Sequence, residues 1–251
     1  MQVSRDEIQK DSPHIPHVIK NSPDMKILEN GISGSNIVTK VILSALSTAM
    51  GLTGAQRYEN SHRNDRPSTS TLAMMHYIPS NPAEDLNVGH QKHTDISSLT
   101  LLFTAQWGLQ VRPPGSKEFG FVAPKKGCAV INVGDSLRFA SGHEFQSCIH
   151  RVVPYDPTEH RYSIAYFLRA ENDTAFTDSE GRFITAGQWH DEKFFAFINP
   201  PEIQAMAPKS LLLGGMAEEE DDETYVTAPS KDAPSPVPVP LPGQNGSIVA
   251  Y

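Results

Sequence analysis

Between residues 70 and 170 the chain is a series of short apolar runs separated by turn-forming residues. The separators include Pro113-Pro114-Gly115 and Lys125-Lys126-Gly127, which favour turns over continued helix or strand. Runs of this length and spacing predict a sandwich or a jelly roll, and spacing alone does not distinguish these from a barrel. The runs are Thr71–Tyr77, Ser98–Thr104, Leu109–Arg112, Gly120–Val122, Cys128–Val133, Gln146–Val153 and Arg161–Leu168.

Two segments outside this region have helical features. In residues 34–52 the apolar positions recur at helical spacing, which predicts a helix with an apolar stripe that needs a partner surface. Ser33 or Ser35 could cap its start, and Gly51 falls near its end. A shorter helix is predicted over 186–199. The stripe of the first helix consists of Ile37, Val38, Val41, Ile42, Leu46 and Met50.

The composition is that of an ordinary globular protein, with 38% hydrophobic and 20% charged residues. The sequence contains no run of 18 apolar residues, so we expect no membrane association. Its polar N-terminus lacks the apolar core of a secretory signal. Two cysteines, Cys128 and Cys148, are too few for a disulfide framework. We therefore expect a cytoplasmic protein.

The net charge of -8 is concentrated in one acidic run, residues 218–223. Without that run the charge is about -2, so the acidity describes a tail and not a site. No basic stripe with interleaved aromatic residues is present in the sequence, and we expect no nucleic-acid partner. Prolines recur between 229 and 242. Residues 214–251 are predicted to form a disordered tail, with a proline-rich ligand for another domain as the alternative.

One group of residues suggests metal chemistry: His93-Thr94-Asp95, followed by His150. Residues two apart in a strand point to the same face, so His93 and Asp95 can reach one ion together. His150 would come from a neighbouring strand. Two histidines and one carboxylate on one face of a metal leave open positions, which suits non-haem Fe(II). Because the chain has 10 histidines, this pattern alone is weak evidence for a metal site.

Four stretches between residues 89 and 168 strengthen that evidence. They are GHQKHTDISSLTLLF (89–103), GLQV (108–111), VINVGDSLRFASGHEFQSCIHRVV (130–153) and RYSIAYFL (161–168). In this order they resemble the motifs of Fe(II)/2-oxoglutarate-dependent dioxygenases of the isopenicillin N synthase-like branch, especially its fungal members. The resemblance implies a mainly β fold with flanking helices, a double-stranded β-helix, in which His93, Asp95 and His150 hold Fe(II). It also implies 2-oxoglutarate and O2 as cosubstrates.

The cosubstrate motif has a physical reason. Arg161 offers a planar, always charged fork that suits the far carboxylate of 2-oxoglutarate, and Ser163 should point the same way. The alternative is a surface arginine on a strand edge. Tyr77 resembles the tyrosine that steadies the same ligand, although Ile78 stands where the family usually has proline, and Tyr77 could instead be a core aromatic residue.

Three further residues lie close to these motifs. Phe167 has the same parity in its strand as Arg161, so it should face the cavity and could contact substrate, or it could be a core aromatic. His90 and Cys148 are expected to lie outside the iron shell. The resemblance implies an oxidoreductase that hydroxylates, desaturates or closes a ring in a small organic substrate, and it suggests secondary-metabolite (natural-product) biosynthesis.

The family usually has a longer N-terminal region, so the chain resembles a truncated member. We divide it into a remnant of that region with one long helix (1–69), a jelly-roll core (70–170), a helical segment (171–213) and the tail (214–251). Three alternatives stay open: an inactive, truncated remnant, a related oxidase that does not use 2-oxoglutarate, and an unrelated cupin-type metal protein.

Overall fold

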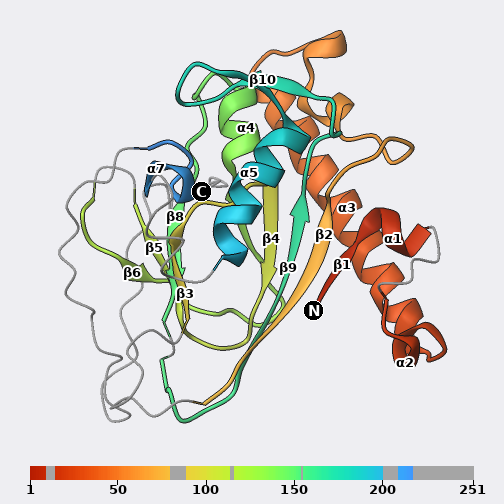
Figure 1. Cartoon of the computed structure of the whole chain (residues 1–251), viewed down its shortest axis with the longest axis vertical. Coiled ribbons are helices and arrows are strands. Elements are labelled where there is room, and N and C mark those ends of the chain that lie inside the picture. Colours follow the sequence, from red (N-terminus) through yellow and green to blue (C-terminus); the bar gives the residue numbers. More distant parts are fainter. Residues whose placement is uncertain (10–14, 80–88, 114–115, 154, 200–208, 217–251) are drawn as a thin grey trace.

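The computed structural model describes residues 1–9, 15–79, 89–113, 116–153, 155–199 and 209–216. Two antiparallel sheets form the body of the molecule, and the long helix α3 (Asp24–Ala49) packs along the five-stranded one (Figure 1). Among the described residues, no helix combines the length and apolar character that a membrane crossing requires. The helices are α1 (Arg5–Gln9), α2 (His17–Lys20), α3 (Asp24–Ala49), η1 (Gly54–Gln56), η2 (Tyr58–Ser61), α4 (Asp135–Ala140), α5 (Ala186–Ile198) and α7 (Lys209–Leu212).

The strands form a five-stranded sheet, a four-stranded sheet and a hairpin. They are β1 (Gln2–Ser4), β2 (Thr71–Tyr77), β3 (His90–His93), β4 (Leu99–Phe103), β5 (Leu109–Arg112), β6 (Gly120–Phe121), β7 (Val130–Val133), β8 (Ile149–Val152), β9 (Arg161–Leu168), β10 (Ala175–Thr177) and β11 (Phe183–Thr185). The larger sheet has the order β1-β2-β9-β4-β7, the smaller one β3-β8-β5-β6, and β10 pairs with β11.

All seven predicted strands are found. The runs that became β2, β5 and β9 have the predicted bounds, and the four others are shortened at one or both ends. The prediction missed β1, β3, α4 and the β10–β11 hairpin. The hairpin lies in the segment 171–213, which we predicted to be helical; among its described residues, those of α5 and α7 are helical. β1, β10 and β11 have three residues each, too few for a period to be recognised, and β3 consists of polar residues.

The five-stranded sheet separates the core from the site. In β9 the side chains of Tyr166 and Leu168 are fully buried in the main core with Leu43 of α3, whereas Arg161 and Ser163 belong to the opposite face. Asn36 of α3 donates a hydrogen bond of 3.1 Å to the Tyr166 hydroxyl. One face of this sheet is therefore packed by α3, and the other is free to carry chemistry.

The position and orientation of α3 differ from the prediction. The helix begins at Asp24, ten residues before the predicted start at 34, because Pro23 stands directly before its first residue, where proline is tolerated. The predicted stripe is only partly the packed face: Ile37 is 61% and Val41 64% exposed, whereas Ile42 and Leu46 pack against the core. The face against the sheet is made of mostly small and polar side chains. These buried residues are Ile32, Ser35, Asn36, Thr39, Leu43 and Ser47.

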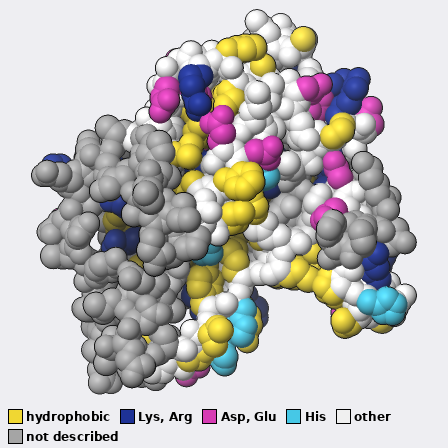
Figure 2. Space-filling view, viewed as in Figure 1, with side chains coloured by type: hydrophobic (Ala, Val, Ile, Leu, Met, Phe, Trp, Pro, Cys, Tyr) yellow, Lys and Arg dark blue, Asp and Glu magenta, His cyan; other side chains and the backbone are white. Residues whose placement is uncertain are grey.

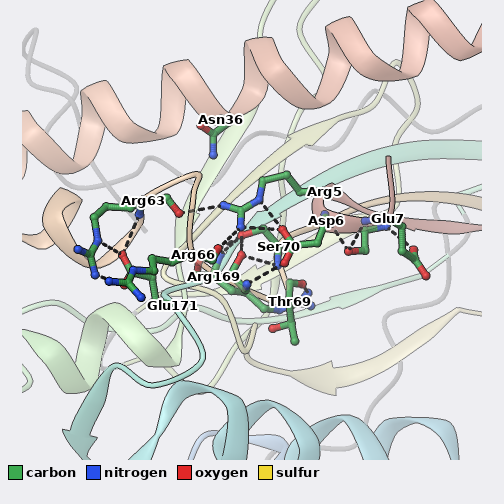
Figure 3. Close-up of polar contacts among 12 residues, drawn as sticks. Arg5, Asp6, Glu7, Asn36, Arg63, Arg66, Thr69, Ser70, Arg169 and Glu171 are labelled. Carbon is green, nitrogen blue, oxygen red and sulfur yellow. Dashed lines mark hydrogen bonds and ion pairs between the residues drawn. The ribbon is translucent and has the colours of Figure 1, made fainter. Parts of the chain in front are cut away.

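Polar contacts tie the N-terminal residues to the end of β9 (Figure 3). The buried Arg5 donates to the Arg66 carbonyl at 2.6 Å and forms an ion pair with Asp6. Ser70 donates to the Arg169 carbonyl at 3.1 Å. β1 meanwhile pairs with β2. The first residues thus belong to the same packed unit as the sheets, while the four segment boundaries that we predicted stay predictions.

The C-terminal residues cover another side of the molecule. Thr185 and Gln188 form a capping box that starts α5, and the helix ends at Ile198, one residue before the predicted end. Figure 2 shows hydrophobic side chains in the middle of this face, over α5, where Phe195 and Ile198 are exposed. The Gly214 carbonyl accepts a hydrogen bond of 2.9 Å from Arg138, so the chain is still packed there. The predicted tail lies outside the described residues from 217 on.

Candidate metal centre

The three predicted iron ligands lie together between the two sheets. His93 ends β3 and is paired directly with His150 of β8. Asp95 lies beyond the end of β3, so the expectation that His93 and Asp95 share one strand is wrong, although their proximity is confirmed. Asp95 Oδ1 is 3.8 Å from His93 Nε2 and 3.6 Å from His150 Nε2. Among the described residues, this is the single group of three or more side chains with metal-ligating atoms so close together.

Backbone carbonyls orient both imidazole rings. His93 Nδ1 lies 2.7 Å from the Gln91 carbonyl, and His150 Nδ1 lies 3.0 Å from the Cys148 carbonyl. Since a carbonyl only accepts, each Nδ1 carries a proton, which leaves Nε2 as the nitrogen that can offer a lone pair to a metal. Burial lowers the pKa of His93 well below its usual range, which keeps that ring neutral. Neutral rings with free Nε2 atoms are the form that binds a metal.

Two polar side chains hold the Asp95 carboxylate. Oδ2 accepts hydrogen bonds from Thr100 Oγ1 at 2.6 Å and from Asn132 Nδ2 at 2.7 Å, which leaves Oδ1 for the histidines. Burial alone would raise the pKa of Asp95, but the nearby histidines and these two donors lower it to about 2. The carboxylate is thus ionised, and its Oδ1 is directed toward the two histidines. Sequence reasoning missed Thr100 and Asn132, although each is a polar residue in an otherwise apolar strand.

A close backbone contact fixes the segment that follows Asp95. The Asp135 amide, at the start of α4, donates to the Asp95 carbonyl at 2.8 Å. A Cβ atom on Gly134 would lie 2.1 Å from the Ser97 carbonyl oxygen, so only glycine allows this approach. The glycine-aspartate turn of the sequence therefore locks the loop that carries one of the three ligand candidates.

Arg161 is a buried cation whose terminal nitrogens make no well-formed hydrogen bond to the described residues. It lies opposite Tyr77 in the pairing of β9 with β2, with its guanidinium 4.9 Å from the centre of the Tyr77 ring. Its Nε donates to the Trp107 carbonyl at 2.9 Å. Burial lowers the pKa of Arg161, and a charge in this position calls for an anion.

The other two predicted cosubstrate residues lie beside this guanidinium. Ser163 is buried two residues further along the same face of β9. The Tyr77 hydroxyl lies 3.0 Å from His90 Nδ1; burial raises the pKa of Tyr77, while Arg161 and Ser163 offset part of this effect. A cation with two neighbouring hydroxyls fits a carboxylate, so the residues present are compatible with 2-oxoglutarate.

The remaining candidates lie as their parity predicts. Phe167 shares the face of Arg161, and the Arg169 guanidinium lies 5.3 Å from the centre of its ring. Its contact with substrate stays a prediction. Burial raises the pKa of the Cys148 thiol to about 12, so this side chain is a neutral thiol, in keeping with a place outside the metal shell.

Comparisons with known proteins agree with this site. A family model described as the 2OG-Fe(II) oxygenase superfamily matches residues 69–170. The chain is 48% identical over 207 residues to the 2-oxoglutarate-dependent dioxygenase iboH of Amanita muscaria, which covers 80% of this chain and 98% of that protein. It is 45% identical over 219 residues to the oxidoreductase vrtI of Penicillium aethiopicum, with 86% of this chain covered but only 52% of that protein.

A solved structure shows the same fold. A full-length Neurospora crassa protein, crystallised in complex with alpha-KG and thymine, matches with a TM-score of 0.61 at 24% identity, over 78% of this chain and 63% of that one. The predicted jelly roll is confirmed, as is the predicted class of oxidoreductase, which uses Fe(II), 2-oxoglutarate and O2. The chain belongs to the 2OG-Fe(II) oxygenase superfamily.

Proposed function

We propose that this chain oxidises a small organic substrate with iron held by His93, Asp95 and His150. The observation that carries this proposal is the direction of three atoms: two Nε2 lone pairs and one carboxylate oxygen face one another, and a hydrogen bond on the far side of each side chain holds it in place. Bound Fe(II) would supply the open positions at which 2-oxoglutarate and O2 react.

The chain's own residues then have separable tasks. Asp95 balances part of the metal charge, while Thr100 and Asn132 prevent its rotation. Arg161, with Ser163 and Tyr77, binds the far carboxylate of 2-oxoglutarate, because its two terminal nitrogens are buried donors without a hydrogen bond among the described residues. Phe167 contacts the substrate. The reaction is hydroxylation, desaturation or ring closure, in natural-product biosynthesis, and the cytoplasmic location stays a prediction.

Two alternatives are weaker. An inactive remnant has no need of donors that hold Asp95, or of a buried arginine whose terminal nitrogens lack hydrogen bonds within the described part of the chain, yet both are present. An oxidase that does without 2-oxoglutarate would have no use for Arg161 in this state. The complete arrangement of ligands, supporting donors and anchor therefore supports an active, 2-oxoglutarate-dependent oxygenase.

Metal binding with Asp95→Ala as the matched variant tests the ligand assignment. Under anaerobic conditions the wild-type chain should bind one Fe(II) per chain, and Asp95→Ala should bind far more weakly. Lys26→Ala removes an exposed surface charge and should behave as wild type. Equal Fe(II) affinity in the wild-type and Asp95→Ala chains would refute the assignment, as would succinate formation that Asp95→Ala retains.

A further inference from the structure

A fully buried lysine lies next to the candidate metal centre. Lys193 of α5 has an exposed fraction of 0%, and its Nζ donates to Asp135 Oδ2 at 2.5 Å and to Thr94 Oγ1 at 2.6 Å. Burial lowers the pKa of Lys193, and the Asp135 carboxylate offsets part of this effect. A dry ion pair is a poor source of stability compared with apolar packing, so its presence invites another explanation.

The Lys193–Asp135 pair reaches both segments that carry the metal ligands. Thr94 lies between His93 and Asp95, so the hydrogen bond to its hydroxyl connects Lys193 to the first ligand-bearing segment. Asp135 Oδ1 accepts a hydrogen bond of 2.9 Å from Ser147, which lies three residues before His150. This bond connects Asp135 to the second ligand-bearing segment. One ammonium group and its carboxylate partner thus connect all three ligand positions.

The same face of α5 reinforces this connection. Trp189, Lys193 and Phe197 are spaced by four residues, and the two rings lie 5.8 and 6.0 Å from the ammonium nitrogen. Phe197 also packs edge-on against the His93 ring, with centroids 5.1 Å apart. α5 lies beside α4 in Figure 1, outside the residues that the family model matches. The helix therefore contacts the ligand loop through an ion pair and a ring.

We propose that Lys193 is a positioning residue that holds His93 and Asp95 in register with His150. This inference rests on the proposed metal centre. Without the ammonium group, the Thr94 hydroxyl loses its donor and the Asp135 carboxylate is left buried and uncompensated. The loop after β3 can then change its conformation, and the three ligand atoms are no longer all directed at one metal position. A purely structural ion pair would instead affect stability and leave metal binding unchanged.

Co(II) titration of the full chain, with its visible absorption spectrum as a report of geometry, tests the proposal. Lys193→Met removes the charge at nearly constant length, and Thr94→Val removes only the hydroxyl. Both should bind Co(II) about 10- to 100-fold more weakly, the usual effect of losing a partner of a metal ligand, with an altered spectrum. Lys26→Met, which removes an exposed lysine paired with Glu29, should match the wild type.

A double variant separates positioning from charge balance. Lys193→Met/Asp135→Asn removes both charges, so it restores whatever stability the unpaired carboxylate cost, but it does not restore the hold on Thr94. We expect its thermal stability to recover relative to Lys193→Met while its Co(II) affinity stays low. Recovery of wild-type affinity and spectrum in the double variant would mean that the pair is structural only, and would overturn the proposal.

The remaining outcomes are also decisive. Wild-type Co(II) affinity and spectrum in a folded Lys193→Met overturns the proposal. If Lys193→Met does not fold, Thr94→Val decides alone: weaker binding supports positioning, and wild-type binding contradicts it. Failure of the metal centre itself is recognised separately, because the wild-type chain would then bind no Co(II), or Asp95→Ala would bind it equally well.

Discussion

Asn132 Nδ2 donates a hydrogen bond of 2.7 Å to Asp95 Oδ2 and thereby turns the other carboxylate oxygen toward the two histidines. The contact joins residues 37 positions apart. It exists because β4 and β7 pair, which places Asn132 opposite Thr100, the second donor to the same oxygen. The orientation of one ligand is thus a product of strand register.

Replacement of Asn132 should therefore weaken metal binding without removing a ligand. Asn132→Leu takes away one of the two donors that fix the carboxylate and lower its pKa, so Fe(II) should bind about 10- to 100-fold more weakly. Anaerobic Fe(II) titration measures this. Asn60→Leu, at an exposed amide of η2 that donates to the Gly54 carbonyl, serves as the control. Unchanged affinity in Asn132→Leu would show that Thr100 alone suffices.

Gly108 should be required for cosubstrate binding more than for metal binding. Its φ is +130°, and a Cβ atom there would lie 2.8 Å from Arg161 Nε. Gly108→Ala should displace the guanidinium and raise the Kd for 2-oxoglutarate at least about tenfold, the effect of losing roughly 1.4 kcal/mol, while Fe(II) affinity stays near wild type. Gly127→Ala controls for backbone strain, because Gly127 also has a positive φ but has nothing near its Cβ position. Equal effects of the two substitutions would contradict this account.

The stability of the apo chain should fall on mild acidification because of His62. This ring is buried, with one nitrogen 2.8 Å from the Tyr58 carbonyl and the other 2.8 Å from Ser98 Oγ, and burial lowers its pKa to about 4. Between that pKa and the unfolded value near 6.5, the unfolded state binds the extra proton, so the free energy of unfolding decreases as pH falls. From pH 7 to pH 5 the loss from this group should be about 2 kcal/mol.

Urea unfolding at the two pH values measures that difference. His62→Gln should be less stable than the wild type at pH 7 but should lose about 2 kcal/mol less on moving to pH 5. His17→Gln replaces an exposed histidine and should keep the wild-type dependence on pH. The same loss of stability in His62→Gln and in the wild-type chain would show that His62 is not the responsible group.

The two faces of α3 should respond in opposite ways to substitution. Leu43 is fully buried, so Leu43→Ala should lower the free energy of unfolding by about 2 to 5 kcal/mol. Val41 is mostly exposed, so Val41→Lys should change it by less than about 0.5 kcal/mol. Denaturant unfolding of both variants tests the orientation of the helix. A large loss of stability in Val41→Lys would mean that the predicted stripe is the packed face after all.

The strands could be predicted because alternation and turns are local properties. β2, β5 and β9 have their predicted bounds for this reason. The orientation of α3 could not be predicted in the same way, because several of its apolar residues, such as Ile37 and Val41, are exposed while polar residues are buried. Thr39 is fully buried because its hydroxyl bonds to the Ser35 carbonyl within the helix, at 2.7 Å. A buried polar residue that satisfies itself locally leaves no signal in a hydrophobic pattern.

The residues of the site also fall into those that could be predicted from the sequence and those that could not. His93, Asp95, His150 and Arg161 could be named because they stand in motifs. Asn132 and Lys193 could not be assigned, because their partners, Asp95 and Thr94, are brought to them by sheet register and by the packing of α5. A motif identifies the residues that bind a ligand, whereas the residues that aim them depend on tertiary contacts.

The most direct test of the account is the visible charge-transfer band that forms when Fe(II) and 2-oxoglutarate bind together under anaerobic conditions. The wild-type chain should show the band, and Arg161→Ala should need much more 2-oxoglutarate to produce it, while both bind Fe(II) alone with similar affinity. This result would establish metal, cosubstrate and anchor in one measurement. A folded wild-type chain without the band, or an Arg161→Ala chain with an unchanged titration, would contradict the proposed site.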